Sequence, residues 1–385
     1  PDAQGEGGEE EGEGGGPASN SPASVELQAI NSLMSACGRS GSPDVALRLL
    51  NEMEGKFGVQ PGVGTYRAAV IACNQAQHER RRARARGEAL PEEECDYNHE
   101  EECDLDDEEC GDEECGGGTL HWWECALSLL RRMREAGLTP DVQTYSSAIS
   151  ACEAAGQWRR AIGVLRSMSE KEVKVAGAKG GAGGGSIPTP PNLFCFNAAI
   201  AACEKGGAWL EAIELYERVR SGGGSGDLRP NFVTVNSLLI ALDRAGQREM
   251  AESVYREAME EGIVSPWKWK FDSDAGKILA LDLHQFSTPM AKIAVRGLMN
   301  SLQLSILDDD AEPEHNSDRD LVIVVGRGRG SEGGKAVLGP VVQDLLAREF
   351  RVQSMVDARN PGRIRVRREE LASYVERMVC DFSLI

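Results

Sequence analysis

Along the first two thirds of the chain, apolar residues recur three and four positions apart, in segments that come in adjacent pairs. This spacing is typical of amphipathic helices, and the Gly that follows most first segments predicts a break between two antiparallel helices. The first segments resemble one another, which indicates an internal repeat. They are AINSLMSACGRSG from Ala29, TYRAAVIACNQAQ from Thr65, TYSSAISACEAAG from Thr144, CFNAAIAACEKGG from Cys195 and TVNSLLIALDRAG from Thr234.

A single helical hairpin cannot bury its own apolar face. The pairs are therefore predicted to stack into an α-solenoid of about five hairpins, whose first helices line a concave surface. One shared position holds a small residue that suits close helix contacts: Ala36, Ala72, Ala151, Ala202 and Ala241. The next position is a cysteine in most copies: Cys37, Cys73, Cys152 and Cys203. We expect these thiols to be buried apolar groups rather than metal ligands or redox centres.

Each unit starts its first helix on Thr-Tyr or a related pair and closes on a Pro followed by Gly, Asp or Asn. In these features residues 25–267 resemble the pentatricopeptide repeat family. The tetratricopeptide repeat has a similar length and binds peptides, but its Trp, Leu-Gly and Tyr pattern is missing here. The resemblance implies a protein that binds single-stranded RNA and reads about one base per repeat.

In that family, bases are read by the residue after the Thr-Tyr pair and by the last residue of the unit. Carried onto this chain, the resemblance implies the pairs Asn31 with Gly62, Arg67 with Asp141, Ser146 with Asn192 and Asn197 with Asn231. Asn236 begins a fifth pair. Gly62 offers no side-chain contact, Arg67 suits a phosphate, and Trp267 stands where an Asp or Asn would close the fifth unit.

The chemistry of these positions predicts base preferences. An amide offers a donor and an acceptor together and matches a pyrimidine edge, whereas a short hydroxyl leaves room for a purine. Ser146 is therefore predicted to prefer adenine, and Asn197 and Asn236 to prefer pyrimidines. In an alternative interpretation the asparagines serve only as local hydrogen-bond partners near the helix starts.

The net charge of −20 argues against nucleic-acid binding until the acidic residues are located. Most of the excess lies in a Gly-rich leader, residues 1–24, and in the stretch from Glu88 to Cys115, so the rest is nearly balanced. We predict disorder for the leader and for an acidic insertion at 77–119, and a flexible surface loop for a Gly-rich insertion at 171–191. The acidic stretch follows an arginine cluster, which indicates that the two neutralise each other or that the acidic stretch competes with RNA for the groove. The cluster consists of Arg80, Arg81, Arg82, Arg84 and Arg86. The four cysteines of the acidic stretch fit no compact zinc pattern.

From residue 277 to 380, short apolar runs alternate with helical patterns, which is typical of a small α/β sandwich. Strands are predicted in ILALDLHQF, LVIVVGRGRG, RVQSMVDA and RIRVRR, and helices in PMAKIAVRGLMNSLQ, VLGPVVQDLLAREF and EELASYVERM. The runs Leu281-Asp282-Leu283-His284 and Gly326-Arg327-Gly328 resemble the LDxH and TGxG motifs of the small MutS-related (SMR) family. Gln285 and Val325 depart from that family's usual Gly and Thr.

Asp282 and His284 stand two apart on a predicted strand and so share a face. By resemblance, Asp282, His284 and Arg327 are catalytic candidates, with Asp282 orienting a water, a metal ion or a 2′-hydroxyl, His284 moving a proton and Arg327 stabilising the phosphorane. The glycine loop lets backbone N–H groups approach a phosphate, so Gly326, Gly328 and Arg329 are assigned to RNA binding. In the alternative interpretation Asp282 and His284 only fix the loop.

These features leave three hypotheses: an RNA endonuclease directed by its repeats, a non-catalytic RNA-binding, protection or translation factor, and a peptide-binding scaffold. The expected partners are single-stranded RNA and other RNA-processing proteins. No cofactor is expected beyond a divalent metal, Mg or Mn, for cleavage. No apolar run reaches the roughly 18 residues that span a bilayer, so no membrane partner is expected. The resemblance implies a chloroplast or a mitochondrion, with any targeting peptide upstream of Pro1.

Overall fold

The computed structural model describes residues 22–56, 58–88, 121–169, 189–222, 228–272, 276–304, 320–327 and 336–382. Backbone contacts divide the chain into two compact units: Pro1–Ala76 with Glu92–Leu138, and Gln77–Pro91 with Thr139–Ile385. The predictions for the leader, for the acidic stretch with its four cysteines, for most of the Gly-rich insertion and for Gly328 and Arg329 fall outside the described residues.

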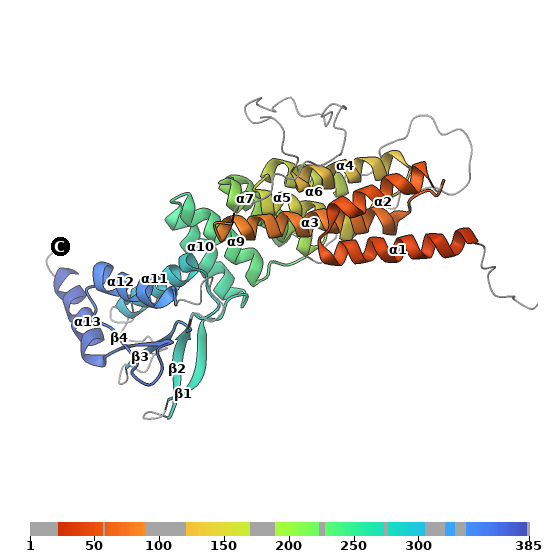
Figure 1. The fold of residues 1–385 in the computed structure, drawn as a ribbon. Coiled ribbons are helices and arrows are strands. Elements are labelled where there is room, and N and C mark those ends of the chain that lie inside the picture. Colours follow the sequence, from red (N-terminus) through yellow and green to blue (C-terminus); the bar gives the residue numbers. More distant parts are fainter. Residues whose placement is uncertain are drawn as a thin grey trace, which may run out of the picture. The chain divides into compact units, whose positions relative to one another are not determined.

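The repeat region forms consecutive pairs of helices (Figure 1). The pairs are α1 (Pro22–Ser40) with α2 (Pro43–Gly55), α3 (Val63–Ala85) with α4 (Trp122–Glu135), α5 (Val142–Ala155) with α6 (Trp158–Ser169), α7 (Leu193–Gly206) with α8 (Trp209–Arg220), and α9 (Phe232–Arg244) with α10 (Arg248–Glu260). The boundary between the two units falls within α3, after Ala76. The residues of α3 from Gln77 onward belong to the second unit.

Short polar residues begin the first helices, and glycines end them. Asp141, Asn192 and Asn231 are the N-caps of α5, α7 and α9, and each side chain accepts a hydrogen bond from the backbone N–H three residues later. Gly156 and Gly207 follow α5 and α7 in the left-handed conformation, with φ of 74° and 72°. That conformation is strained for residues with a Cβ, so glycine ends the helix and lets the chain reverse.

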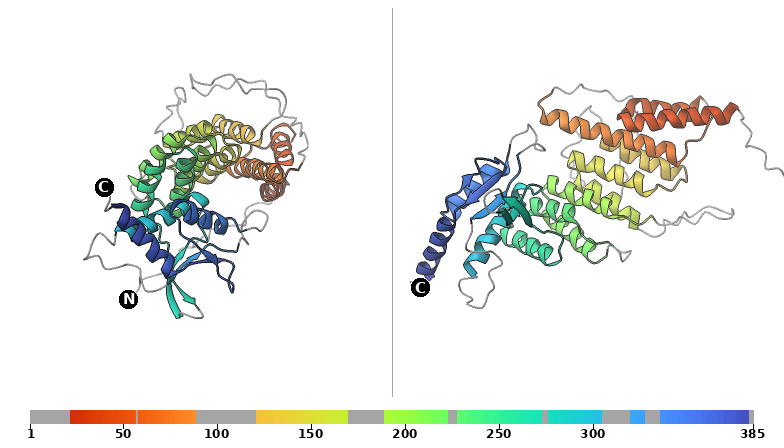
Figure 2. Two further views of the ribbon diagram at one scale, coloured as in Figure 1. Left: turned by 90° about the vertical axis from the view of Figure 1, so that its left-hand side faces the viewer. Right: turned by 90° about the horizontal axis from the view of Figure 1, so that it is seen from below.

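In the second unit the first helices stack directly on one another, α5 against α7 and α7 against α9. Figure 2 shows α5 to α10 side by side in chain order. Large apolar side chains fill the stack, and Ile149, Phe196, Ile200 and Leu238 are fully buried. The predicted solenoid of stacked helical pairs is confirmed for this part of the chain.

The cysteines and small residues of the repeat occupy the positions expected of core residues. Cys37, Cys73, Cys152 and Cys203 are all buried, and none of them forms a disulfide within the described part of the chain. Burial raises the pKa of Cys152 and of Cys203 to about 12. Four of the five shared alanines are also buried. Ala36 is exposed, contrary to the prediction, because α1 has no preceding repeat to cover this side among the described residues.

Two predicted boundaries differ from the structure. Helix α3 continues to Ala85, so the arginine cluster up to Arg84 is helical and Arg86 follows in a turn; these residues do not belong to an irregular insertion starting at residue 77. Ala, Arg, Gln and Glu all favour helix, which explains why α3 continues beyond its apolar pattern.

The α/β region begins at Trp267 rather than at residue 277, because β1 (Trp267–Asp272) already pairs with β2 (Gly276–Asp282).

The C-terminal region contains one five-stranded mixed sheet in the order β1-β2-β3-β5-β4. The β1–β2 pair is antiparallel, β2 and β3 (Leu321–Val324) are parallel, and β5 (Arg363–Val366) is antiparallel to β3 and to β4 (Met355–Val356). Helices α11 (Thr288–Leu304), α12 (Leu338–Glu349) and α13 (Arg368–Phe382) complete the region. The predicted strands and helices are all present, with β1 in addition.

The α/β region packs against the last pair of helices of the solenoid. Helix α11 contacts both α9 and α10, and the rings of Phe232 and Phe286 lie 5.8 Å apart between centroids. Glu349 of α12 lies 3.8 Å from Arg248 of α10 and 2.5 Å from Arg296 of α11. The region therefore covers the end of the repeat stack, where the apolar face of the last hairpin would otherwise meet water.

Among the described residues, no helix combines the length and apolar character needed to cross a bilayer.

Gly206, the last residue of α7, allows the close approach of α6. A Cβ at this position would overlap the indole ring of Trp158. We therefore expect Gly206→Ala to lower the free energy of unfolding by about 1 to 3 kcal/mol, the usual cost of overpacking. Gly163→Ala is the matched control, because its Cβ would meet open space within α6 and alanine there should stabilise by about 0.5 to 1 kcal/mol. Urea unfolding measures both, and equal effects of the two variants would contradict the packing argument.

Candidate functional sites

The proposed base-reading residues gather at the N-terminal ends of the first helices. The last residue of a unit is the N-cap of the next first helix, and the next reading residue follows five positions later, as in Asn192 and Asn197 or Asn231 and Asn236. Asn192 and Asn231 are exposed, whereas Asn197 and Asn236 are partly buried. Asn192 and Asn231 therefore do serve as local hydrogen-bond partners at the helix start, as the alternative interpretation held.

The structure brings the pair Asn197 and Asn231 together. The Asn197 Nδ2 donates to Asn231 Oδ1 at 3.4 Å, and the Thr234 hydroxyl donates to Asn197 Oδ1 at 2.7 Å. In the first unit the Thr65 hydroxyl donates to Asn31 Oδ1 at 3.0 Å, and the backbone N–H of Gly62 donates to Thr65 Oγ1. These two reading amides are thus held by hydrogen bonds from the following repeat.

The other reading residues are placed differently. Ser146 is 8% exposed and donates to the carbonyl of Gln143 in its own helix. The Oδ1 atom of Asn236 is buried and has no hydrogen-bond partner among the described residues. Arg67 and Asp141 belong to different units. Trp267, which the sequence suggested as the close of the fifth repeat, instead begins β1.

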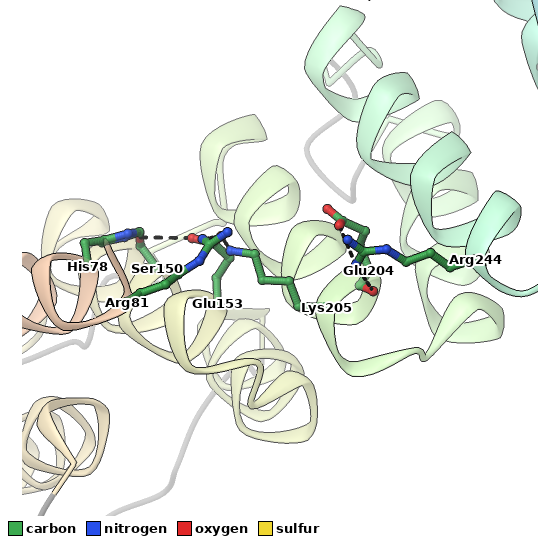
Figure 3. A network of polar contacts seen from close by, with 7 residues as sticks. All are labelled: His78, Arg81, Ser150, Glu153, Glu204, Lys205 and Arg244. Atoms are coloured by element: carbon green, nitrogen blue, oxygen red, sulfur yellow. Dashed lines mark hydrogen bonds and ion pairs between the residues drawn. The ribbon is translucent and has the colours of Figure 1, made fainter. Parts of the chain in front are cut away.

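A ladder of charged side chains links the first helices of the second unit (Figure 3). Glu153 of α5 forms ion pairs with Arg81 of α3, at 3.6 Å, and with Lys205 of α7. Glu204 of α7 forms the next pair with Arg244 of α9, at 2.8 Å. Each carboxylate lies on one helix and its cation on a neighbouring helix, so the ladder joins consecutive repeats.

Burial shifts the titration of several ladder groups. Burial, together with the charges of Lys205 and Arg81, lowers the pKa of His78 to about 4, and its Nε2 lies 2.9 Å from the Ser150 hydroxyl. Burial and the neighbouring Arg81 and Arg244 lower the pKa of Lys205 to about 8. Burial raises the pKa of Glu204, against the opposing effect of Arg244. At neutral pH His78 is therefore an uncharged member of the ladder.

The arginine cluster on α3 is partly neutralised by nearby carboxylates. Arg86 contacts Glu79 at 2.9 Å and Glu88 at 2.6 Å, and Arg82 lies 3.7 Å from Glu79. These groups are largely exposed, so the pairs contribute little stability. The cluster keeps local acidic partners even without the rest of the acidic stretch.

A second constellation forms where the parallel strands β2 and β3 end. Asp282 is opposite Val324 of β3, and Val324 is opposite Arg363 of β5. His284 lies in the turn two residues after the end of β2, and its Nδ1 lies 2.5 Å from Asp282 Oδ1. The loop after β3 holds Gly326 beside His284, so a Cβ at Gly326 would lie 3.5 Å from that of His284. Loops that follow parallel strands meet at one edge of a sheet, and this explains the convergence.

Arg327 is fixed on the same loop. Its Nε and Nη2 donate to Asn360 Oδ1 at 3.2 Å and 3.1 Å. The Gly362 carbonyl accepts from the backbone N–H groups of Val325 and Gly326. A Cβ at Gly362 would lie 3.0 Å from Arg327 Cγ, so this glycine permits the close approach of the two loops. The arrangement leaves the Arg327 side chain exposed.

Two lysines that sequence reasoning missed complete this constellation. Lys270 Nζ lies 2.8 Å and Lys268 Nζ 3.8 Å from Asp282 Oδ2. Burial opposes ionisation of Asp282, but the hydrogen bonds from Lys270 and His284 prevail and hold the pKa of this carboxyl below its ordinary value. The alternating Trp-Lys-Trp-Lys of β1 is a strand signal that could have revealed them.

The residues around Asp282 do not fit a divalent metal. One oxygen of its buried carboxylate faces Lys270 and the other faces His284. No group of three His, Cys, Asp or Glu side chains with ligand geometry occurs in the part of the chain that the structure describes. A metal-binding role for Asp282 therefore has no support in this geometry.

Comparison with known families identifies the helical pairs. The family model described as "PPR repeat" matches residues 29–56 and 194–223, and that described as "Pentatricopeptide repeat domain" matches residues 128–175. The chain contains pentatricopeptide repeats. A pentatricopeptide repeat-containing protein of Arabidopsis thaliana is 28% identical over 100 residues, which are 26% of this chain and 16% of that protein. The chain thus matches only a small part of this relative.

Solved structures that resemble the chain also contain these repeats. The pentatricopeptide repeat domain of protein-only RNase P 1 from Arabidopsis thaliana, solved in complex with tRNA, has a TM-score of 0.40 and 12% identity, covering 64% of this chain and 93% of that one. The pentatricopeptide repeat protein PPR10 from maize has a TM-score of 0.41 and 17% identity, covering 84% of this chain and 32% of that one.

The titration of His78 predicts a pH dependence of stability. Its pKa is about 4 in the folded protein and close to 6.5 in an unfolded chain. As the pH falls below about 6.5, the unfolded state takes up a proton that the folded state excludes, so stability is lost between pH 6.5 and pH 4. We expect the loss between pH 7 and pH 5 to be about 1 to 2 kcal/mol smaller in His78→Gln. Urea unfolding at the two pH values measures this difference, and equal losses in both proteins would show that His78 is not excluded from protonation.

Proposed function

We propose that this protein binds single-stranded RNA through its pentatricopeptide repeats, with bases contacted at the N-terminal ends of the first helices. The observation that carries the proposal is the convergence of Asn197 and Asn231 from consecutive repeats, 3.4 Å apart. Asn31 is held by the following repeat through a different contact, the hydrogen bond from the Thr65 hydroxyl. Amides at regular intervals along a stack of helices suit the reading of successive bases of an extended strand.

A peptide-binding scaffold is a weaker candidate, because the matched repeats are pentatricopeptide repeats. By the same resemblance we propose that the RNA is organellar, in a chloroplast or a mitochondrion, and that the protein acts there with other RNA-processing proteins. Whether it cuts the RNA or only protects it or assists translation depends on the C-terminal region. The acidic stretch after Glu88 is proposed to compete with RNA for the arginines of α3.

The RNA-binding proposal predicts selectivity for single strands. The full chain should bind a single-stranded RNA pool more tightly than duplex RNA of the same composition, because the bases of a duplex are paired and hidden. Binding should weaken about tenfold or more between low and physiological salt, since phosphate contacts release counterions. Fluorescence anisotropy with labelled RNA measures both, and an unstructured peptide library is the comparison ligand. Equal affinity for duplex and single strand would contradict the proposal.

A second candidate function, cleavage of the bound RNA, rests on the contact between Asp282 and His284. This pair and the nearby Gly326 and Arg327 belong to the two runs that resemble the motifs of the SMR family. The Asp282 carboxylate is anionic and buried, and it accepts a hydrogen bond from His284 Nδ1. A histidine held in this way keeps its proton on Nδ1 and leaves Nε2 free to take one.

The proposed roles follow from these contacts. His284 Nε2 removes a proton from the attacking hydroxyl or water, and Arg327 stabilises the negative charge that develops on the phosphate. Asp282 is a positioning residue, because its oxygens face Lys270 and His284 and its side chain is buried. In the binding-only alternative, the same pair fixes the loops and Arg327 contacts a phosphate without any cleavage.

The cleavage proposal predicts the effect of Asp282→Asn. The amide keeps the shape of the side chain but no longer holds the histidine tautomer, so we expect kcat to fall roughly 10²- to 10⁴-fold, with RNA affinity nearly unchanged. Labelled RNA resolved on a denaturing gel measures cleavage, and anisotropy measures binding. Lys268→Gln is the matched control, because Lys268 lies farther from the carboxylate and should leave kcat within a few-fold.

The outcomes separate the two candidates. Full cleavage by a folded Asp282→Asn protein would refute the proposed role of Asp282. Absence of cleavage by the unaltered protein, with and without added Mg or Mn, would favour the binding-only function. Thermal unfolding of each variant shows whether a loss of activity reflects a loss of fold.

A further inference from the structure

Two buried threonines occupy equivalent positions in different repeats. Thr65 and Thr234 stand three residues after Gly62 and Asn231, the residues that precede α3 and α9, and they are 2% and 0% exposed. Each hydroxyl accepts a hydrogen bond from the backbone N–H of the residue before its helix, at 3.3 Å from Gly62 and 3.1 Å from Asn231. Each therefore uses an oxygen lone pair to close the start of its own helix.

Each threonine hydroxyl then has one hydrogen to donate, and a reading asparagine of the preceding repeat accepts it. The distances are 3.0 Å from Thr65 Oγ1 to Asn31 Oδ1 and 2.7 Å from Thr234 Oγ1 to Asn197 Oδ1. Thr234 also lies 3.0 Å from Asn231 Oδ1, but that oxygen already accepts from the Thr234 N–H and from Asn197 Nδ2. We call this chain of hydrogen bonds, from a backbone N–H to a threonine hydroxyl and from that hydroxyl to an asparagine carbonyl, the relay. It occurs once in each compact unit.

The relay fixes which end of the amide is available to a ligand. The oxygen and nitrogen of an asparagine amide are distinguished by their hydrogen-bond partners. A donor hydroxyl on one side requires the carbonyl oxygen there, so the NH₂ group must point to the other side. Asn31 and Asn197 therefore turn their NH₂ groups toward a ligand, while their carbonyl oxygens face the threonines. One of the two hydrogens of Asn197 Nδ2 is donated to Asn231 Oδ1, which leaves the other for a ligand.

We propose that Thr65 and Thr234 are positioning residues for base selectivity: by engaging the Asn31 and Asn197 carbonyls, they make these amides select pyrimidines through a carbonyl oxygen of the base. The O2 oxygen is common to uracil and cytosine, so this contact does not separate the two pyrimidines. Adenine has no carbonyl oxygen, and the O6 oxygen of guanine lies farther from the ribose than O2 does, so a donor held at the O2 position favours pyrimidines. The inference rests on the proposed RNA binding and adds the residue that orients the contact.

The other repeats lack the relay, because each of them lacks either the threonine donor or the asparagine acceptor. Helix α7 has Cys195 in place of the threonine, and the preceding reading residue, Ser146, donates to its own helix instead. No repeat follows Asn236, because β1 follows α10, and the Asn236 carbonyl oxygen has no partner among the described residues. Thr144 donates to Asp141 Oδ1 at 2.6 Å, and the reading residue before it is Arg67, which has no carbonyl group in its side chain.

Removal of one hydroxyl tests the proposal. Thr234→Val keeps the volume of the side chain but cannot donate, whereas Thr234→Ser keeps the hydroxyl. We measure binding of the full chain to a single-stranded RNA pool with all four bases at every position, and sequence the bound fraction. Thr234→Val should reduce the pyrimidine-to-purine preference about tenfold at one position and leave the other positions unchanged. Thr234→Ser should retain the preference. A merely structural role would weaken binding at all positions alike.

Introduction of the relay is the converse test. Ser146→Asn alone would face Cys195, which is a poor donor, so its amide should gain at most a weak pyrimidine preference. Ser146→Asn with Cys195→Thr should gain a clear one at the position that Ser146 contacts. The proposal is overturned if the single variant matches the double variant, or if Thr234→Val keeps its full preference. If the unaltered protein does not bind the pool at all, the proposed function fails first and this inference falls with it.

Discussion

The start of each first helix is the constraint on which both the stability and the recognition surface of this protein depend. The first N–H groups of a helix have no partner within it and need a side chain to accept from them. Asp141, Asn192 and Asn231 meet this need in the second unit. Asn231 caps α9 and also lies beside Asn197, the proposed reading residue of the preceding repeat. A change of Asn231 that alters the proposed base preference would therefore also alter the helix cap, so selectivity and folding would be coupled at this position.

The last repeat of the solenoid is not followed by another helical hairpin that could cover it. Helix α11 covers α9 and α10, so the last repeat is closed by an α/β region instead of another hairpin. Asn236 consequently lacks the threonine that a sixth repeat would supply. Beyond it, polar side chains converge through strand ends rather than helix caps, since β2 and β3 are parallel and their following loops meet at His284 and Gly326. A parallel pair brings two loops together without requiring them to be close in sequence.

Local patterns were sufficient to predict most of the fold. The helical period located both helices of each repeat. The period of two predicted Asp282 and His284 on one face of a strand, but β2 ends at Asp282, and His284 contacts it from the following turn. Strand β1 was missed because Trp267 occupies the position where a repeat would end and its alternate residues are lysines. The partners Lys268 and Lys270 depend on the register of β1 with β2. The orientation of Asn197 likewise depends on Thr234, 37 residues away. Neither contact can be obtained from a short window of sequence, because each requires two elements to be placed in space first.

The charge ladder sets how an RNA backbone would meet the first helices. Lys205 and Arg244 already have carboxylate partners in Glu153 and Glu204 (Figure 3). A phosphate that contacts either cation must displace a carboxylate, so it exchanges one ion pair for another instead of neutralising a free charge. Each cation that releases counterions on binding single-stranded RNA adds about −0.7 to the slope of log affinity against log salt concentration. Cations paired within the protein release few counterions, so the ladder shifts the balance of affinity from the phosphates toward the base contacts. If the protein binds RNA as proposed, its base contacts, and the hydroxyls that orient the reading amides, would therefore contribute more to affinity than the paired cations do.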